Sequence, residues 1–367
     1  MPTVFFAFRD APERRAALSA PESLDRYRLF GLDEVRAHGA QVRHNLERGG
    51  GAPLWARAAA RAVNGLLRLT GGYGGDFASA FASLRTANQA NVVFATTDTV
   101  GIPLILLKRA GLLRPPLVYA AIGLPERLVE LKSRPMRRLY VGAFRRVAKI
   151  VAYAESEAEW LRRWLGGGAP AVLFLPFGVD VEAFSPDAGR TEDVDVVSVG
   201  ADPRRDFDLL STVAARNAAL RFRIVATRDH ARLLGTLPAN VVLETDLPLE
   251  QVRDRLAAAR VVALPVRRNS YSGATTVLLQ AMALAKPVVV SRTDAISKGY
   301  ALQDGVNCRL VEPGDANAFE RILLETLADS RSLGSRARET VEREFSWKRY
   351  TDRLWEILSA AWQRDPS

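Results

Sequence analysis

The chain has 367 residues, a length that suits two domains of ordinary size. Hydrophobic residues make up 48% of it, enough for well-packed cores, and its formal net charge is +10. The single cysteine, Cys308, excludes an internal disulfide and favours an intracellular location. The three histidines lack the spacing of metal ligands, so the sequence predicts neither a metal site nor a bound cofactor.

Charged residues also argue against a membrane-spanning or secreted chain. We expect no secretory signal, because charged side chains over residues 9–15 interrupt any apolar core near the start. The most apolar long segment, residues 92–113, contains Asp98, Lys108 and Arg109, so we do not expect it to cross a membrane. We therefore expect a cytoplasmic protein.

The basic excess belongs to the first half of the chain. Residues 1–185 hold 25 Lys and Arg against 16 Asp and Glu, a net of +9, and the remainder holds 26 against 25, a net of +1. The segment that begins at Arg127 and ends at Lys149 has Glu130 as its one acid, and its interleaved apolar residues predict a basic amphipathic helix. Two interpretations stay open: a peripheral contact with the anionic inner face of a membrane, or a helix with one packed and one solvated face. We do not expect a nucleic-acid partner.

In the first half, short apolar runs alternate with helical segments, as in a parallel α/β architecture. We expect strands over residues 3–8, 41–46, 91–95, 117–120 and 149–153. We expect helices over residues 21–38, 53–69, 101–109 and 155–165. Residues 9–19 are expected to form a loop, and residues 96–99 to cap the helix that follows them. The segment 53–69 lies between glycine runs, which suggests either a mobile element beside a binding site or a surface insertion without a role.

The second half repeats this alternation. A cluster of Pro, Gly and Asp near residues 176–186 predicts a domain boundary at about residue 186. We expect strands over residues 194–199, 222–226, 241–243, 261–264 and 287–290. The turn of residues 269–276 opens a helix with small and hydroxylated residues, where unpaired backbone N–H groups attract phosphate.

These motifs resemble those of glycosyltransferases with the two-domain GT-B fold, especially the family-four group. The resemblance covers most of residues 91–362 and is strongest from residue 173 onward, and its most specific part is residues 304–315. It implies an α/β fold with two Rossmann-like, doubly wound domains. Residues 1–186 would bind the acceptor, residues 187–345 the nucleotide sugar, and residues 346–367 would form a helix that crosses back to the first domain.

The resemblance also implies a donor site in the second half. The loop that starts at Gly200 would bring Arg204 and Arg205 to the diphosphate, whose charge guanidinium groups can bind and stabilise. The family has one Glu before the phosphate turn and another eight positions later, and this chain has Ser272 and Gln280 there. Gln280 would bind the ribose through its amide. The residues expected at the diphosphate are Ser272, Gly273, Ala274, Thr275 and Thr276.

The family resemblance also implies a nucleobase contact and a candidate catalytic base. The main chain from Thr245 to Leu247 would lie along the nucleobase. Many family members have a histidine near the position of Ile122, and here Glu126 is the nearest carboxylate that could act as a base. A glutamate that simply favours the start of a helix is the alternative interpretation of Glu126.

The expected activity is metal-independent transfer of a hexose from a nucleotide-diphosphate sugar, such as a UDP-sugar, to a hydroxyl of a glycan, lipid-linked or small-molecule acceptor. Retention of the donor's anomeric configuration is expected by analogy alone. Two alternatives stay open: a noncatalytic partner protein that binds nucleotide sugars, and a nucleotide-sugar epimerase of the same fold.

Overall fold

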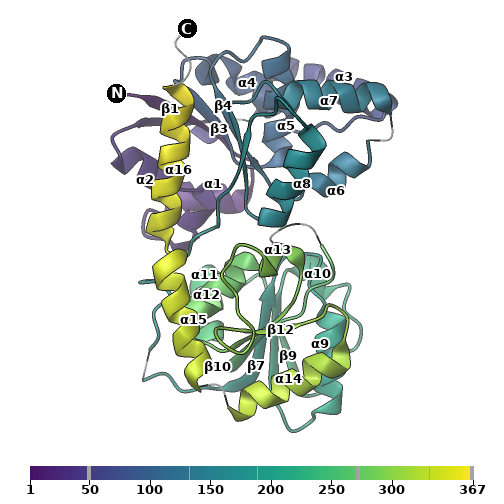
Figure 1. Ribbon diagram of the computed structural model, residues 1–367, viewed down its shortest axis with the longest axis vertical. Coiled ribbons are helices and arrows are strands. Elements are labelled where there is room, and N and C mark those ends of the chain that lie inside the picture. The colour runs from purple at the N-terminus through teal and green to yellow at the C-terminus, as the bar shows by residue number, and fades with distance from the viewer. Residues whose placement is uncertain are drawn as a thin grey trace. The chain divides into compact units, whose positions relative to one another are not determined.

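The computed structural model describes residues 1–47, 51–131, 133–187, 189–269, 271, 273–329 and 331–363. The chain divides into two compact units (Figure 1). Unit 1 is Met1–Leu175 together with Thr351–Ser367, and unit 2 is Pro176–Tyr350. The division therefore falls after Leu175 and not after residue 186.

Unit 1 is built on a parallel sheet of six strands, counted over its described residues, in the order β2-β1-β3-β4-β5-β6. Its strands are β1 (Thr3–Ala7), β2 (Gln41–His44), β3 (Val92–Ala95), β4 (Leu117–Ala121), β5 (Lys149–Ala152) and β6 (Ala171–Phe174). Its helices are α1 (Pro12–Ser19), α2 (Leu32–Ala37), α3 (Leu54–Leu69), α4 (Phe77–Ala87), α5 (Asp98–Arg109), α6 (Leu124–Val129), α7 (Arg134–Phe144) and α8 (Glu155–Leu165), with 3-10 turns at Leu24–Leu29 and Asn45–Glu47. Each of these strand pairs is parallel, so the chain must return to the same edge of the sheet between consecutive strands. Helices form most of these crossover connections.

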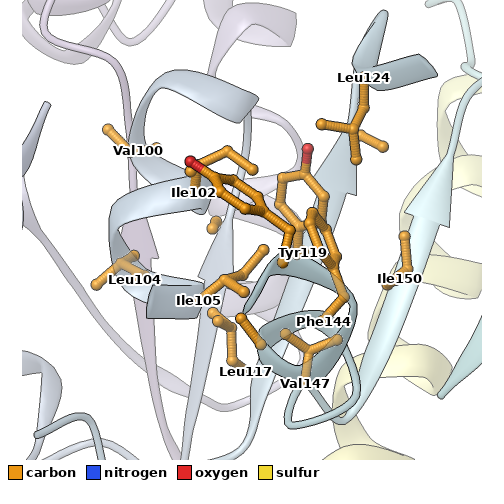
Figure 2. Packing of buried hydrophobic residues seen from close by; sticks show 14 of the residues in the cluster. Val100, Ile102, Leu104, Ile105, Leu117, Tyr119, Leu124, Phe144, Val147 and Ile150 are labelled. Atoms are coloured by element: carbon orange, nitrogen blue, oxygen red, sulfur yellow. The ribbon is translucent and has the colours of Figure 1, made fainter. Parts of the chain in front are cut away.

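The core of unit 1 lies between the sheet and helices α5, α7 and α8. Strands β3, β4 and β5 are buried along their whole length, which explains why they are continuous apolar runs without alternation. Figure 2 shows Tyr119 of β4 packed among Ile105 of α5 and Phe144 of α7. The rings of Tyr119 and Phe144 meet edge to face at 5.9 Å, a favourable aromatic geometry.

Unit 2 contains the second parallel sheet, in the order β12-β11-β10-β7-β8-β9 over the residues that are described. This is the 3-2-1-4-5-6 order of the Rossmann fold. Its strands are β7 (Val194–Gly200), β8 (Phe222–Ala226), β9 (Val241–Thr245), β10 (Ala259–Leu264), β11 (Val288–Ser291) and β12 (Arg309–Val311). Its helices are α9 (Phe207–Arg216), α10 (Arg228–Ala231), α11 (Leu249–Ala257), α12 (Thr275–Ala283), α13 (Asp294–Ser297), α14 (Ala316–Ala328) and α15 (Arg331–Glu344). Helices α9 and α14 cover one face of this sheet and α11 and α12 the other (Figure 1).

The last helix, α16 (Trp347–Trp362), begins in unit 2 and continues in unit 1. In unit 2, Trp347 packs edge to face on Phe177 with 5.6 Å between ring centroids. In unit 1, the ring of Trp355 stacks on His38 at 5.2 Å. Gly31 has a φ of +85° there, and a Cβ on it would lie 3.1 Å from the methyl group of Thr351, so the helix approaches the backbone closely.

The expectation of a doubly wound α/β fold with two Rossmann-like parts is confirmed, and several local predictions are wrong. Residues 12–19 form α1 where a loop was expected, and the helix expected over residues 21–38 is broken by Phe30 and Gly31, both with positive φ. The basic segment from Arg127 to Lys149 is not one helix. Its central part is α7, and Lys149 is the first residue of β5 and is buried. Over the described residues, the structure contains no helix with the length and apolar character needed to cross a bilayer.

Candidate functional site

The strand order of unit 2 places a switch point between β7 and β10. From β7 the chain proceeds outward through β8 and β9, and it then returns to the other side of β7 to form β10. In open parallel sheets, ligands bind at the carboxyl ends of the two strands that flank such a point. A ligand site is therefore expected at the loops that follow β7 and β10.

The two loops are tied together by main-chain contacts. Arg205 forms an antiparallel bridge with Val266. The backbone N–H of Asp206 donates to the carbonyl of Pro265 at 2.9 Å, and the N–H of Arg267 donates to the carbonyl of Arg204 at 2.8 Å. These bonds fix the shape of the loops without using the side chains of the two adjacent arginines.

Arg205 carries a buried guanidinium. Its side chain is 1% exposed, and none of its three nitrogens donates a hydrogen bond within the part of the chain that the structure describes. A Cβ on Gly200 would lie 2.2 Å from Nε of Arg205, so only glycine at the end of β7 leaves room for this side chain. Burial lowers the pKa of Arg205 to about 10, and the nearby Asp202 carboxylate partly opposes that fall. A buried charge that lacks a partner is strongly destabilising, so this group is suited to receive an anion.

Arg204 differs from its neighbour because its side chain is exposed. Its backbone N–H donates to Oδ1 of Asp202 at 2.7 Å. The same oxygen accepts the hydroxyl of Tyr271 at 2.9 Å, which joins the loop after β10 to the loop after β7. Of the two arginines, Arg205 is the buried one.

The start of α12 lies beside this cluster. A Cβ on Gly273 would lie 2.7 Å from Oδ2 of Asp202, so the turn before the helix touches the loop after β7. Ala274 is the N-cap residue and has no side chain that could cap the helix. Thr275 is buried beside the hydroxyl of Tyr300, and Thr276 is half-buried. Ser272 lies outside the described residues.

The remaining predicted donor residues also lie in unit 2. Gln280 lies on α12 and is 3% exposed. Thr245 ends β9, which is two strands from β7 and so roughly 10 Å from it. Leu247 is half-buried in the loop after Thr245. Between them, Asp246 adopts a φ of 53°, and its carboxylate accepts the N–H of Arg228 at 3.0 Å.

Three polar side chains at the same edge of the sheet were not expected from the sequence. Nδ1 of His230, both amide atoms of Asn269 and Oγ1 of Thr293 are buried and have no hydrogen-bond partner within the described segments. They follow β8, β10 and β11, so each lies near the carboxyl end of its strand. Strands β8 and β10 pair with β7, and β11 pairs with β10. Because proteins rarely leave buried polar atoms unpaired, their gathering here marks a surface built for a polar ligand. Their positions just after predicted strands are the sequence signal that could have identified these three residues.

Unit 1 carries a separate group of buried carboxyls near Glu126. Asp98 accepts hydrogen bonds from the hydroxyl of Tyr119 and from the N–H of Ile122, so its role is not to cap α5 as expected. Burial raises the pKa of Asp98 to about 6. Burial also raises the pKa of Glu157 to about 8, and Oε1 of Glu157 accepts the N–H of Leu124 at 3.0 Å. Glu126 itself is half-buried on α6.

Unit 1 also contains a polar cavity of about 270 Å³ beyond the carboxyl ends of β1 and β2. Asp10 and Arg15, which form an ion pair at 2.7 Å, line one side of it. Asn45 and Ser79 line another side and are joined by a hydrogen bond of 2.8 Å. These donors and acceptors suit a small molecule with several hydroxyl groups.

Comparison with known proteins agrees with this geometry. Residues 190–329 match the family described as "Glycosyl transferases group 1". Over 222 residues the chain is 27% identical to a GDP-mannose-dependent monoacylated alpha-(1-6)-phosphatidylinositol monomannoside mannosyltransferase of Corynebacterium glutamicum, an alignment covering 53% of this chain and 58% of that protein. The chain spans a little over half the length of the curated relatives it matches.

Solved structures share the whole fold. Sucrose-phosphate synthase from Thermosynechococcus elongatus aligns over 100% of both chains, with a TM-score of 0.76 and 15% identity. Anabaena HepE, in complex with UDP and glucose, aligns over 98% of this chain and 100% of its own, with a TM-score of 0.70 and 17% identity. The chain therefore has the GT-B fold. It is a homologue of glycosyltransferases, and its resemblance to the family-four group is confirmed.

Proposed function

We propose that this protein is a glycosyltransferase that moves a sugar from a nucleotide-diphosphate donor to an acceptor hydroxyl. The observation that carries the proposal is the buried guanidinium of Arg205 at the switch point of unit 2, whose nitrogens have no hydrogen-bond partner among the described residues. A diphosphate would supply the negative charge that this group lacks, through short charge-assisted hydrogen bonds. The names of the relatives support a sugar nucleotide as its source, since one is GDP-mannose-dependent and another is in complex with UDP.

The donor would lie across the carboxyl ends of the strands of unit 2. Arg205 and the uncapped start of α12 would hold the diphosphate, and the exposed Arg204 would close over it from the solvent side. Gln280 would bind the ribose. The base would lie toward the main chain at Thr245 and Leu247.

The reaction breaks the bond between the anomeric carbon and the diphosphate oxygen and forms a bond from that carbon to the acceptor oxygen. The nucleoside diphosphate leaves with the bonding electron pair, and the acceptor hydroxyl gives its proton to Glu126 or to the departing diphosphate. Because charge grows on the leaving phosphate, a preorganised guanidinium stabilises the transition state more than the ground state. Two arginines would supply the positive charge that a metal supplies elsewhere, so we propose metal-independent transfer. The family resemblance supports retention, with Ser272 in the place of the family's first glutamate.

The acceptor would bind to unit 1. Its polar cavity suits a polyol, and the names of relatives include a phosphatidylinositol monomannoside mannosyltransferase and a D-inositol 3-phosphate glycosyltransferase. Glu126 would act as the base or bind the acceptor hydroxyl. The exposed arginines of the segment from Arg127 to Lys149 would add a peripheral contact with an anionic membrane.

Thermal unfolding with UDP, UDP-glucose and GDP-mannose, each with and without EDTA, tests the proposal. A ligand at about 100 times its Kd should stabilise by about 2.7 kcal/mol. Stabilisation that persists in EDTA, followed by slow donor hydrolysis on incubation, is the expected result. Binding without any hydrolysis would favour a noncatalytic partner protein, and a changed sugar in the absence of acceptor would favour an epimerase. No stabilisation by any of the three nucleotides would refute the donor site.

A further inference from the structure

Helix α3 of unit 1 exposes large apolar side chains that the core does not need. Leu54 is 80% exposed, Trp55 61%, Leu66 64% and Leu69 88%. The inner face of the helix is already satisfied, because Ala60 and Leu67 are buried against Phe77 of α4. The exposed apolar residues therefore form a second face whose partner is not part of this chain's core.

The spacing of the residues separates α3 into three stripes. At about 100° per residue, the positions of Leu54, Trp55, Leu66 and Leu69 fall within an arc of about 120°. The buried residues lie on the opposite side of the helix. Three arginines, Arg57, Arg61 and Arg68, form a narrow row along one edge of the apolar arc, and all three are exposed.

The charge of this region has one sign. No acidic residue occurs between Glu47 and Asp76 in the sequence. An apolar stripe with tryptophan, bordered by arginines, is the composition of helices that lie in the interface of a bilayer, with the cations at the level of the lipid phosphates. We propose that α3 docks the protein on an anionic lipid bilayer by inserting Leu54, Trp55, Leu66 and Leu69 between the headgroups.

Helix α7 is a neighbour of α3 and would assist it electrostatically. The backbone N–H of Tyr73, four residues after α3, donates to the hydroxyl of Tyr140 on α7 at 2.7 Å, and Figure 1 shows both helices in the same part of unit 1. On α7, Tyr140 and Phe144 are buried in the core, so its exposed surface offers mainly arginine. Insertion of apolar side chains is thus assigned to α3, and attraction to anionic lipid is shared by both helices.

Cosedimentation of the full chain with vesicles tests the proposal. We expect binding to vesicles of phosphatidylcholine with phosphatidylglycerol, and much weaker binding to phosphatidylcholine alone. Leu54→Gln should lower the partition coefficient roughly tenfold, since one fully buried leucine contributes about that factor. Leu233→Gln is the matched control, because Leu233 is also 80% exposed but belongs to unit 2. Arg61→Gln should weaken binding about fivefold, and only to the anionic vesicles.

A second measurement locates the contact. Brominated lipids should quench a component of the tryptophan fluorescence that Trp55→Phe removes. The proposal would be overturned if the wild-type chain bound neither kind of vesicle. It would also be overturned if Leu54→Gln and Leu233→Gln lowered binding equally, or if Trp55→Phe left the quenching unchanged. A lipid-free dimer that Leu54→Gln converts to a monomer would assign the face to contact between copies instead. Stabilisation by UDP should survive in every α3 variant, so failure here is distinguishable from failure of the donor site.

Discussion

Replacement of Arg205 by methionine should make the ligand-free protein more stable while it removes binding of the diphosphate. The buried guanidinium has a pKa of about 10 instead of its ordinary value of 12.5. That difference corresponds to about 3 kcal/mol against the charged form in the folded protein, because one pKa unit is worth about 1.4 kcal/mol. A folded pKa below the unfolded one means that this penalty is complete at all pH values below about 10. A neutral side chain avoids it.

Methionine is suitable because it keeps an unbranched stem beside Gly200 and carries no charge. For a unit of the size of Pro176–Tyr350, 1 kcal/mol shifts Tm by about 2–4 °C, so Arg205→Met should raise the Tm of unit 2 by about 6–12 °C. The exposed Arg204 provides the control. Arg204→Met should change the free energy of unfolding by less than about 0.5 kcal/mol.

Calorimetric scans with and without UDP measure both effects. The loss of charge-assisted bonds should weaken UDP binding by a factor of about 10 to 100. The UDP concentration that stabilises the wild-type protein by about 2.7 kcal/mol should then stabilise Arg205→Met by about 1.4 kcal/mol or less. A variant that is less stable without ligand and still responds fully to UDP would refute the assignment of Arg205 as an unpaired charge that awaits an anion.

Three other substitutions probe the same reasoning. Gly200→Ala places a methyl group 2.2 Å from Nε of Arg205 and should displace that side chain. Isothermal calorimetry should show a loss of UDP affinity of about tenfold with little change for uridine, and equal losses for both ligands would contradict a phosphate role. Asn269→Ala removes a buried amide that has no hydrogen-bond partner among the described residues. Chemical denaturation should show a change in the free energy of unfolding of less than about 1 kcal/mol while donor affinity falls, and the reverse pattern would make the amide structural. Glu157 has a folded pKa of about 8, above its ordinary 4.5, so the folded state binds its proton more tightly and stability falls as pH rises through this window. Glu157→Gln keeps an oxygen for the N–H of Leu124, so the variant should be the more stable protein at about pH 9, and parallel pH profiles for the two proteins would refute the shift.

Much of the fold could be predicted from the sequence because buried parallel strands are continuous apolar runs. The bounds of β8 and α8 agree with the residues expected, 222–226 and 155–165. Helix α1 was missed because its sequence, PERRAALS, has no apolar stripe and buries only Ala17. The basic segment was misjudged because apolar spacing alone does not show that α6 ends at Val129 and that a separate helix, α7, begins at Arg134. The strand expected over residues 149–153 is present as β5.

The site was less accessible to sequence analysis because its key contacts join residues far apart in the chain. Arg204 and Arg205 are adjacent and chemically identical, so the sequence alone does not show that Arg205, which pairs with Val266 of the loop after β10, is the buried one. Asp98 was expected to cap a helix because it stands at a helix start. Its actual partner, the hydroxyl of Tyr119, comes from the next strand of the sheet.

The buried ionisable groups of the two units differ in the direction in which burial shifts their pKa values. In unit 1, Asp98 and Glu157 have raised pKa values, so each can relieve the penalty of burial by taking up a proton. In unit 2, Arg205 keeps its proton at neutral pH even with a pKa of about 10, so its charge can be compensated only by an anion. Proton uptake therefore suffices for Glu157 near neutral pH, and Asp98 has partners in Tyr119 and Ile122. The charge of Arg205 is offset only in part by the Asp202 carboxylate, so a negatively charged ligand would complete its compensation. This asymmetry is why we place the diphosphate, and the stabilisation of its growing charge, on unit 2.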